Sequence, residues 1–170
     1  QVNEQFSNGI SSYWKGNIDH FTVNAQQQLQ LNAPQAGSSD IYTSIQIMDS
    51  MEFSFYIQLQ FAPSLSNRLV INLLGDTNVM TNALYLEIGE NGNADAWNLF
   101  YLNESIRQSI TKGSSGSLST DPAQCRFRIL YRKSKEWIIS TDYTGGFNFT
   151  EDIRIPDTFN IPLMNPVFGF

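Results

Sequence analysis

The chain has 170 residues, of which 41% are hydrophobic and 15% are charged, and this composition fits one globular domain with a sizeable core. Its net charge of −6 and its pI near 4.6 argue against nucleic acid and anionic membrane surfaces as partners, because both attract basic patches. A single cysteine excludes an internal disulfide, and no apolar run of about 18 residues indicates a membrane span.

The first predicted strands are short. Phe21 and Val23 alternate with polar residues, Leu29 and Leu31 do the same, and a third alternating run covers 41–47. Alternation with period two is typical of a strand that has one buried face and one wet face. Between these runs, 32–39 is rich in Gly, Pro and Ser and predicts a turn.

The run 51–61 alternates without a fault and predicts the longest strand. One side carries Met51, Phe53, Phe55, Ile57, Leu59 and Phe61, and the other carries Glu52, Ser54, Tyr56, Gln58 and Gln60. At about 3.3 Å per residue such a strand is roughly 36 Å long, enough to cross a whole sheet. Pro63 follows closely and ends it, because proline cannot donate a hydrogen bond to the ladder.

The rest of the chain continues as short strands separated by turns. The predicted strands are 68–74, 84–88, 96–102, 106–110, 123–131 and 137–141, with weaker runs at 147–150 and 167–170. Residues 133–136 predict a tight hairpin, and no amphipathic helix is found. The pattern predicts a single all-β domain over 1–170, a two-sheet antiparallel sandwich of roughly eleven to thirteen strands.

Several segments in this order resemble a known family. They include His20-Phe-Thr-Val-Asn, Glu52-Phe-Ser-Phe, Leu84-Tyr-Leu-Glu-Ile-Gly, Arg126-Phe-Arg-Ile and Trp137-Ile-Ile-Ser-Thr-Asp. Over nearly the whole chain they resemble the N-terminal domain of exported lamin-tail-domain proteins from Bacteroides-type bacteria. That domain is similar to the concanavalin A-like lectin and glucanase sandwich, and the ending from Trp137 to Asp142 is similar to laminin-G-like sandwiches.

The resemblance implies a jelly-roll sandwich in an exported protein that is periplasmic, associated with the outer membrane or extracellular. The family's domain continues beyond the strand that corresponds to 168–170, so we expect this chain to be truncated at its C-terminus relative to the full protein. A truncated sandwich leaves one sheet edge bare, and a bare edge invites self-association.

The sequence predicts a protein that is not an enzyme. Retaining glycoside hydrolases need two carboxyl groups about 5 Å apart. The Glu-x-Asp-x-x-Glu pattern that places them on one strand of this fold is absent. Glu87 and Glu90 diverge if their strand persists, as do Glu151 and Asp152.

No metal or other cofactor is predicted from the residues. His20 stands alone, and Cys125 lies in phase with Phe127 and Ile129, as a buried small hydrophobic residue would. The fold resemblance leaves calcium open, because oxygen ligands can come from distant loops. The aspartates at predicted strand ends are Asp76, Asp95, Asp121 and Asp142.

Carbohydrate binding is the sharper hypothesis. A sugar is held by an aromatic face and by amides or carboxylates that meet its hydroxyl groups. Six residues of one strand parity could present these groups together on one outer sheet face: Tyr56, Gln58, Gln60, Asn72, Tyr85 and Glu87. The alternative is an ordinary polar face with two scattered tyrosines.

The remaining candidates have structural interpretations. Trp137 is expected in the core and Trp14 over one end of the sandwich, whereas Trp97 lies in a run with two apolar faces, with the core as the default. Arg126, Arg128 and Arg132 share one strand face and are expected to pair with acidic side chains. We therefore expect a non-catalytic module of an exported envelope protein that binds glycan on a curved sheet. The alternative is a structural or protein–protein interaction domain without a small ligand.

Overall fold

A computed structural model describes residues 3–76, 81–104, 106–159, 161–162 and 165–170. Within these ranges the chain is all-β, with one short 3-10 helix, η1 (Ile18–His20). The strands are β1 (Lys15–Gly16), β2 (Phe21–Val23), β3 (Leu29–Leu31), β4 (Ile41–Ser44), β5 (Ser50–Leu59), β6 (Leu69–Asp76), β7 (Ala83–Ile88), β8 (Trp97–Asn103), β9 (Ile106–Lys112), β10 (Ala123–Arg132), β11 (Glu136–Asp142), β12 (Thr150–Pro156) and β13 (Pro166–Gly169). No helix in the described ranges is long and apolar enough to cross a membrane.

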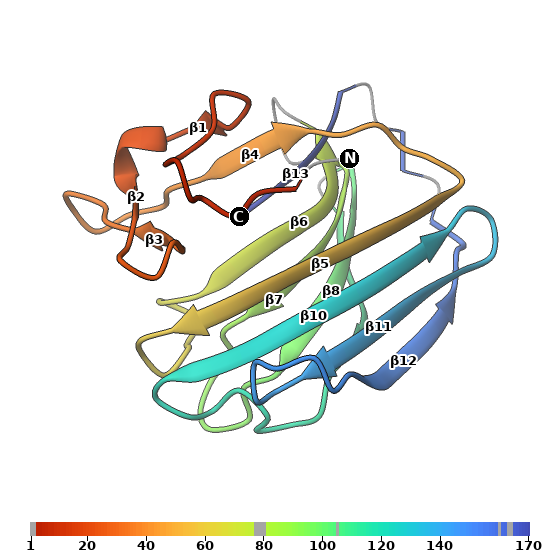
Figure 1. The fold of residues 1–170 in the computed structure, drawn as a ribbon. Coiled ribbons are helices and arrows are strands. Elements are labelled where there is room, and N and C mark those ends of the chain that lie inside the picture. Colours follow the sequence, from red (N-terminus) through yellow and green to blue (C-terminus); the bar gives the residue numbers. More distant parts are fainter. Residues whose placement is uncertain (1–2, 77–80, 105, 160, 163–164) are drawn as a thin grey trace.

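The strands form an antiparallel β-sandwich (Figure 1). One sheet has seven strands in the order β1-β4-β13-β6-β7-β8-β9, and the other has four in the order β12-β11-β10-β5. β2 and β3 form a small separate hairpin sheet. The sandwich prediction is thereby confirmed, and the strand order shows which strands are neighbours within each sheet.

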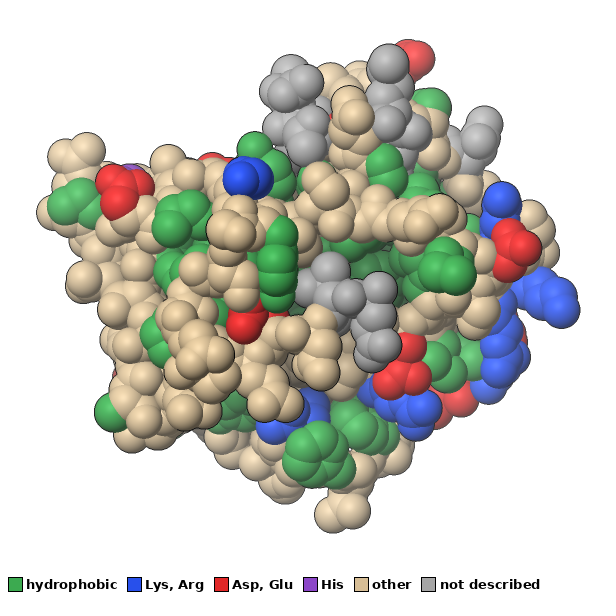
Figure 2. Space-filling model, turned by 45° about the horizontal axis from the view of Figure 1, so that its top comes forward, with side chains coloured by type: hydrophobic (Ala, Val, Ile, Leu, Met, Phe, Trp, Pro, Cys, Tyr) green, Lys and Arg blue, Asp and Glu red, His purple; other side chains and the backbone are tan. Residues whose placement is uncertain are grey.

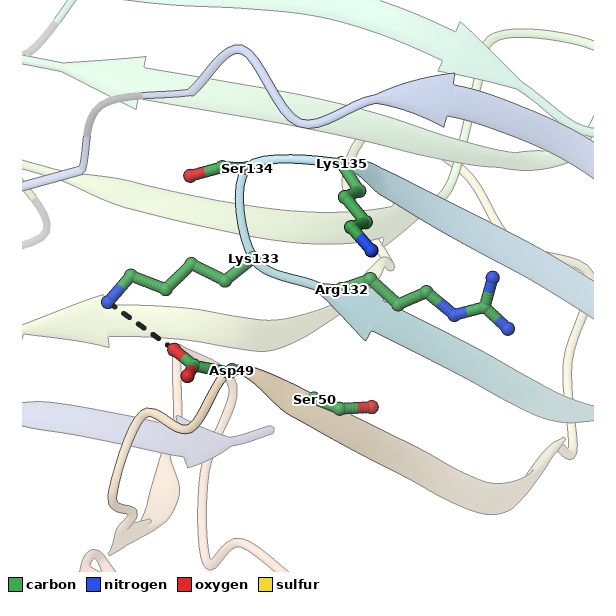
Figure 3. Close-up of a pocket in the computed structure, with 6 residues that line it drawn as sticks. All are labelled: Asp49, Ser50, Arg132, Lys133, Ser134 and Lys135. Carbon is green, nitrogen blue, oxygen red and sulfur yellow. Dashed lines mark ion pairs between the residues drawn. The ribbon is translucent and has the colours of Figure 1, made fainter.

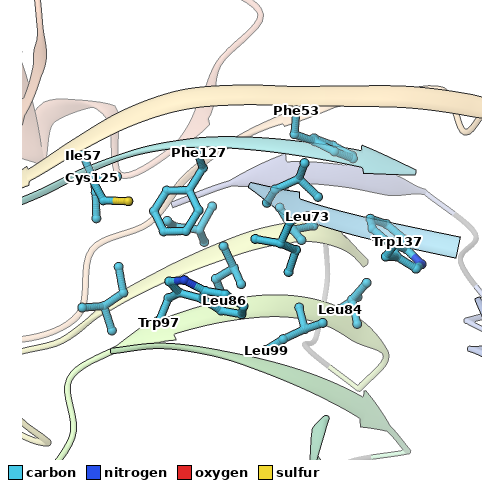
Figure 4. Packing of buried hydrophobic residues seen from close by; sticks show 14 of the residues in the cluster. Phe53, Ile57, Leu73, Leu84, Leu86, Trp97, Leu99, Cys125, Phe127 and Trp137 are labelled. Atoms are coloured by element: carbon cyan, nitrogen blue, oxygen red, sulfur yellow. The ribbon is translucent and has the colours of Figure 1, made fainter. Parts of the chain in front are cut away.

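The core lies between the two sheets (Figure 4). Phe53, Ile57 and Phe127 come from the four-stranded sheet, while Leu86 and Trp97 come from the seven-stranded sheet. The alternation of apolar residues along β5 and β10 therefore fills the layer between the sheets, as the period-two pattern requires. Both faces of the strand that contains Trp97 are apolar in sequence. Because Trp97 is fully buried, its side of β8 is the one that faces the core.

The other two tryptophans lie where the pattern placed them. Trp137 is 1% exposed and stacks beside Phe53, with ring centroids 6.4 Å apart. Trp14 is buried and stacks on Phe170 at 6.2 Å. Its indole nitrogen lies 3.3 Å from a carboxylate oxygen of Glu4, so the N-terminal segment is fixed against the end of β13.

The hairpin 133–135 joins β10 to β11, as expected, with Ser134 at a positive φ of 55°. β12 is the element that the sequence pattern located least well, because the weak run at 147–150 overlaps it only at Thr150. A register shift against β11 between Ile139 and Ser140 interrupts its alternation.

Candidate functional site

The six predicted ligand-binding residues do not share one sheet face. Tyr56 and Gln58 lie on β5 of the four-stranded sheet, and Gln60 follows the end of that strand. Asn72 on β6 and the pair Tyr85 and Glu87 on β7 belong to the seven-stranded sheet. Equal parity in successive strands places side chains together only within one sheet, and the chain changes sheet between β5 and β6. The prediction of a single six-residue face is therefore wrong.

Of the three residues on the seven-stranded sheet, Tyr85 and Glu87 are buried, and Asn72 is partly buried with its Oδ1 enclosed and without a hydrogen-bond partner. Tyr85 is 6% exposed and its ring stacks on Phe100 with centroids 5.5 Å apart. Burial raises the pKa of the Tyr85 phenol above its ordinary value. Glu87 is 7% exposed and accepts a hydrogen bond from Arg107 at 2.8 Å, with Arg68 at 3.6 Å. These two side chains hold the sheet together and are not free for a ligand.

A cleft of about 230 Å³ borders Glu87 on this outer face. The ring of Phe100 lines this cleft. It stacks on Tyr85, and the guanidinium carbon of Arg107 is 3.6 Å from the centroid of the Phe100 ring. Among the polar groups of the cleft, Glu90 pairs with Lys112 at 3.4 Å. The aromatic faces and most polar atoms here are already used within the protein, although one Glu90 oxygen is buried without a partner.

The other half of the set lies beside an exposed aromatic residue. Across the β5–β10 ladder Tyr56 is opposite Arg126, whose guanidinium carbon is 5.3 Å from the tyrosine ring centroid. The same carbon is 4.3 Å from the ring centroid of Phe147, and Phe147 is 74% exposed. We call Tyr56, Arg126 and Phe147 the Arg126 platform.

A loop between β11 and β12 carries Phe147, and Asp142 shapes this loop. One oxygen of the Asp142 carboxylate accepts bonds from the backbone N–H and the hydroxyl of Thr144, at 2.9 and 2.6 Å. The other accepts the backbone N–H of Asn148 at 2.8 Å. These hydrogen bonds, that of the Thr144 hydroxyl foremost, lower the pKa of Asp142 below its ordinary value. The loop conformation is therefore fixed by a charged group that is 6% exposed.

Contacts from β10 hold the same loop against the sheet. Arg126 donates from Nε to the carbonyl of Gly145 at 3.0 Å, and Gln124 donates to the carbonyl of Thr144 at 3.1 Å. Gly145 has φ +78°, and a Cβ at this position would come within 2.8 Å of the Tyr56 ring. A glycine is needed here both for the backbone angle and for the close approach.

The platform leaves hydrogen-bonding capacity unused. In the described ranges the terminal nitrogens of Arg126 and the amides of Gln58 and Gln60 have no hydrogen-bond partner in the protein. Gln58 and Gln60 are exposed, whereas Tyr56 donates its hydroxyl to Gln124 at 3.0 Å. The site therefore combines an exposed ring, a guanidinium and free amides, which can meet a ligand that has both C–H faces and hydroxyl groups.

The predicted pairing of the three arginines on β10 is confirmed for two of them. Arg128 pairs with Glu52 at 3.2 Å and Arg132 pairs with Glu136 at 2.6 Å. Arg126 has no ion pair within the described part of the chain, so the prediction is wrong for this residue. Its guanidinium lies between two aromatic rings instead.

Two platform residues, Arg126 and Phe147, were not in the predicted site. Arg126 was assigned an acidic partner because alternation alone does not show what lies above a sheet face. Phe147 follows the Thr144-Gly-Gly turn signal, and an aromatic residue directly after such a turn is the signal that could have identified it.

A second depression of about 540 Å³ lies at the β10–β11 hairpin (Figure 3). It is lined by Asp49, Ser50, Arg132, Lys133, Ser134 and Lys135. Figure 3 shows Lys133 reaching toward Asp49, and the two charges are 3.7 Å apart. No aromatic ring is among the described residues that line this depression, and these residues offer no face on which a sugar could stack.

The aspartates considered for calcium do not come together. Asp142 orders its own loop, one oxygen of Asp95 accepts the backbone N–H of Glu90 at 2.9 Å, and one oxygen of Asp76 accepts that of Asn165 at 2.9 Å. In the described part of the chain no group of three His, Cys, Asp or Glu side chains could hold a metal ion.

Cys125 and His20 are far from forming a nucleophilic pair. Cys125 is fully buried in the core, and burial raises the pKa of its thiol well above the ordinary value. His20 instead lies 2.8 Å from the hydroxyl of Ser39. The interpretation of Cys125 as a small hydrophobic residue is confirmed.

Comparison with known proteins adds no relative: no family model, no curated protein and no solved structure matches this chain.

Proposed function

We propose that this chain is a non-catalytic glycan-binding module and that the Arg126 platform is its binding site. The observation that carries the proposal is the exposed ring of Phe147, fixed above Arg126 by a loop that Asp142 orders. A phenylalanine that is 74% exposed adds little to the core, and the contact of its ring with Arg126 leaves most of the ring open to solvent. It is placed to cover the apolar face of a ligand.

The chemistry of the platform suits a sugar ring. The C–H face of a pyranose stacks on Phe147, while the free amides of Gln58 and Gln60 bind adjacent hydroxyl groups on the same side. The terminal nitrogens of Arg126 are donors only, so they bind ring oxygens, hydroxyl oxygens or the carboxylate of an acidic sugar. The face shown in Figure 2 is mostly uncharged, with most of its Lys, Arg, Asp and Glu side chains gathered on the right.

The wider setting is also proposed, on the basis of the sequence. The antiparallel sandwich supports the jelly-roll, concanavalin A-like architecture, and with it the module of an exported bacterial envelope protein of the lamin-tail-domain type. Export to the periplasm, the outer membrane or the cell exterior remains a prediction, as does the absence of catalysis.

A protein–protein interaction domain is the second candidate. Tyr and Arg, two of the three residue types in the platform, are among those that dominate binding energy in protein interfaces. A protein partner would cover Phe147 and pair with Arg126 without needing the amides of Gln58 and Gln60. The two functions therefore differ in their dependence on these amides.

A glycan array tests the proposal with three proteins. Wild type is compared with Phe147→Ala and with Ile106→Ala, a matched control that removes a side chain 73% exposed on β9. We expect wild type and Ile106→Ala to bind the same glycans. Phe147→Ala should weaken binding at least about tenfold, equivalent to about 1.4 kcal/mol.

Two results would overturn the glycan proposal. One is a wild-type protein that binds no glycan above background across neutral and acidic structures. The other is a Phe147→Ala variant that binds as tightly as wild type. A variant with Gln58→Ala and Gln60→Ala then separates the two candidate functions, because only a glycan site loses affinity with the amides.

A further inference from the structure

We propose that two copies of this chain associate by antiparallel pairing of their β5 strands, which joins two four-stranded sheets into one continuous sheet. β5 is the outermost strand of its sheet (Figure 1). It pairs with β10 on one side only. In the described part of the chain no backbone hydrogen bond links β5 to a segment on its other side.

The other edge strands of the two main sheets, β9, β12 and β1, carry features that hinder strand pairing, and β5 does not. β9 carries Arg107 and Lys112 and has a register shift against β8. β12 carries Glu151, Arg154 and Pro156 and has a register shift against β11. β1 is only two residues long. Charges, proline, bulges and short length are the usual means by which proteins protect a sheet edge.

β5 is by contrast long, regular and nearly uncharged. Its ten residues pair with β10 without a register shift and include neither proline, glycine, lysine nor arginine. The one charged residue, Glu52, pairs with Arg128 at 3.2 Å across the ladder, and its side chain remains 45% exposed. An edge of this kind is a ready template for another strand.

The strand is complementary to a second copy of itself. An antiparallel pairing centred on Phe55 places Phe55 opposite the same residue of the second copy. On the inner face it places Phe53 opposite Ile57 and Met51 opposite Leu59. Every inward position then meets an apolar residue. The outward position of Glu52 meets Gln58, so no like charges face each other.

The interior next to this edge is incompletely covered, which supports pairing at this place. Phe55, Phe168 and Phe170 are only partly buried, although their rings contact one another at 5.3 to 6.3 Å. A neighbouring strand against β5 would cover the Phe55 side of this aromatic group. The interface is small, so we expect a weak dimer that forms reversibly with concentration.

The expected register gives a test at Gln58, where one substitution should weaken the dimer and another should strengthen it. Because Gln58 is expected opposite Glu52 of the other copy, Gln58→Glu places like charges opposite each other twice in the dimer. Gln58→Lys places opposite charges there. We expect the dissociation constant to rise about fivefold for the first variant and to fall about fivefold for the second. Gln58 is exposed, so both variants should fold as the wild type does.

Ser109→Glu and Ser109→Lys are the matched controls. Ser109 is exposed on the edge strand β9, and these substitutions change the net charge by the same amounts. Sedimentation equilibrium at about 0.15 M salt measures all five proteins, and hydrogen exchange reports which amides gain protection as concentration rises. We expect unchanged dimerisation in the controls and concentration-dependent protection in 50–59.

The proposal is overturned by a wild type that stays monomeric up to about 500 μM. It is also overturned if the Ser109 variants shift the equilibrium as the Gln58 variants do, or if the protected amides lie outside β5. No glycan is present in this experiment, so its failure leaves the proposed function unaffected. Its success would place two Arg126 platforms on one sheet.

Discussion

The indole nitrogen of Trp97 on β8 lies 3.1 Å from Oδ2 of Asp152 on β12, and this hydrogen bond joins the two sheets beside the core. The same oxygen accepts the hydroxyls of Thr141 at 2.7 Å and Tyr143 at 3.1 Å. One carboxylate oxygen thus accepts from three donors, which come from strands β8 and β11 and from the loop after β11. Buried donors of this kind need a partner, because they have lost their water.

Replacing Asp152 by Ala should destabilise the protein by roughly 1–3 kcal/mol, because buried donors then lose their acceptor. Urea unfolding followed by tryptophan fluorescence measures this change. Glu151→Ala is the control, since Glu151 is its exposed neighbour and, among the described residues, pairs with Arg154 alone. Equal unfolding midpoints for the two variants would show that the shared carboxylate does not support the sandwich.

Alternation in the sequence predicted which side of a strand faces the core, but not which strands form a sheet. The inward residues Phe53, Ile57 and Leu59 of β5 are all buried, as the pattern required. The partner of β5 is β10, although residues 60–122 separate the two strands in the sequence. The next strand in sequence, β6, lies in the other sheet. Pairing over such distances depends on the packing of the whole chain. For this reason the six residues predicted to share one sheet face lie on two different sheets.

Burial of the outer faces was equally hidden from the sequence. The alternation in sequence predicts that Glu87 is exposed to solvent. Arg68 and Arg107 pair with its carboxylate and allow it to be buried. Trp97 could not be oriented because the outward positions of β8 include Phe100, which is covered by Arg107. Phe147 lies in a weak run that forms a loop and not a strand, and the position of its ring depends on hydrogen bonds that Asp142, Arg126 and Gln124 make to this loop.

The two tyrosines first grouped together should now respond differently to substitution. Tyr85→Ala removes a buried ring and should cost about 3 kcal/mol of stability in urea unfolding. Tyr56→Ala removes a half-buried ring from the Arg126 platform and should mainly weaken glycan binding. Parallel measurement of unfolding and array binding checks both. If Tyr85→Ala lost binding while keeping wild-type stability, the assignment of the site to the four-stranded sheet would be wrong.

Cys125 should resist thiol reagents until the protein unfolds. It is fully buried, and burial keeps the pKa of its thiol high, so thiolate is scarce at pH 8. We expect almost no reaction with an aromatic disulfide reagent in buffer and one equivalent in denaturant. Rapid labelling of the native protein would mean that the core opens near β10.

The contact between Glu4 and the Trp14 region should make the N-terminal segment sensitive to acid. Burial opposes ionisation of Glu4, but hydrogen bonds from Ser11, Tyr13, the Phe6 backbone and Trp14 outweigh it. Together they lower the pKa of Glu4 from 4.5 to about 2. A carboxyl whose pKa is lower in the folded state stabilises that state fully above 4.5, and this contribution is lost as the pH falls toward 2.

Glu4→Gln isolates this contribution from the other carboxyl groups. At pH 6 the variant should unfold at lower urea than wild type, because its amide nitrogen cannot accept the bonds that the carboxylate accepts. As the pH falls from 5 toward 2 the difference should shrink, since wild type loses the charge that the variant never had. Unfolding curves at about five pH values, followed by tryptophan fluorescence, measure the difference. If the difference in unfolding midpoint between wild type and Glu4→Gln stayed constant with pH, the pKa of Glu4 would not be lowered in the folded protein. The contacts of Glu4 with Ser11 and Trp14 would then not favour its ionised form.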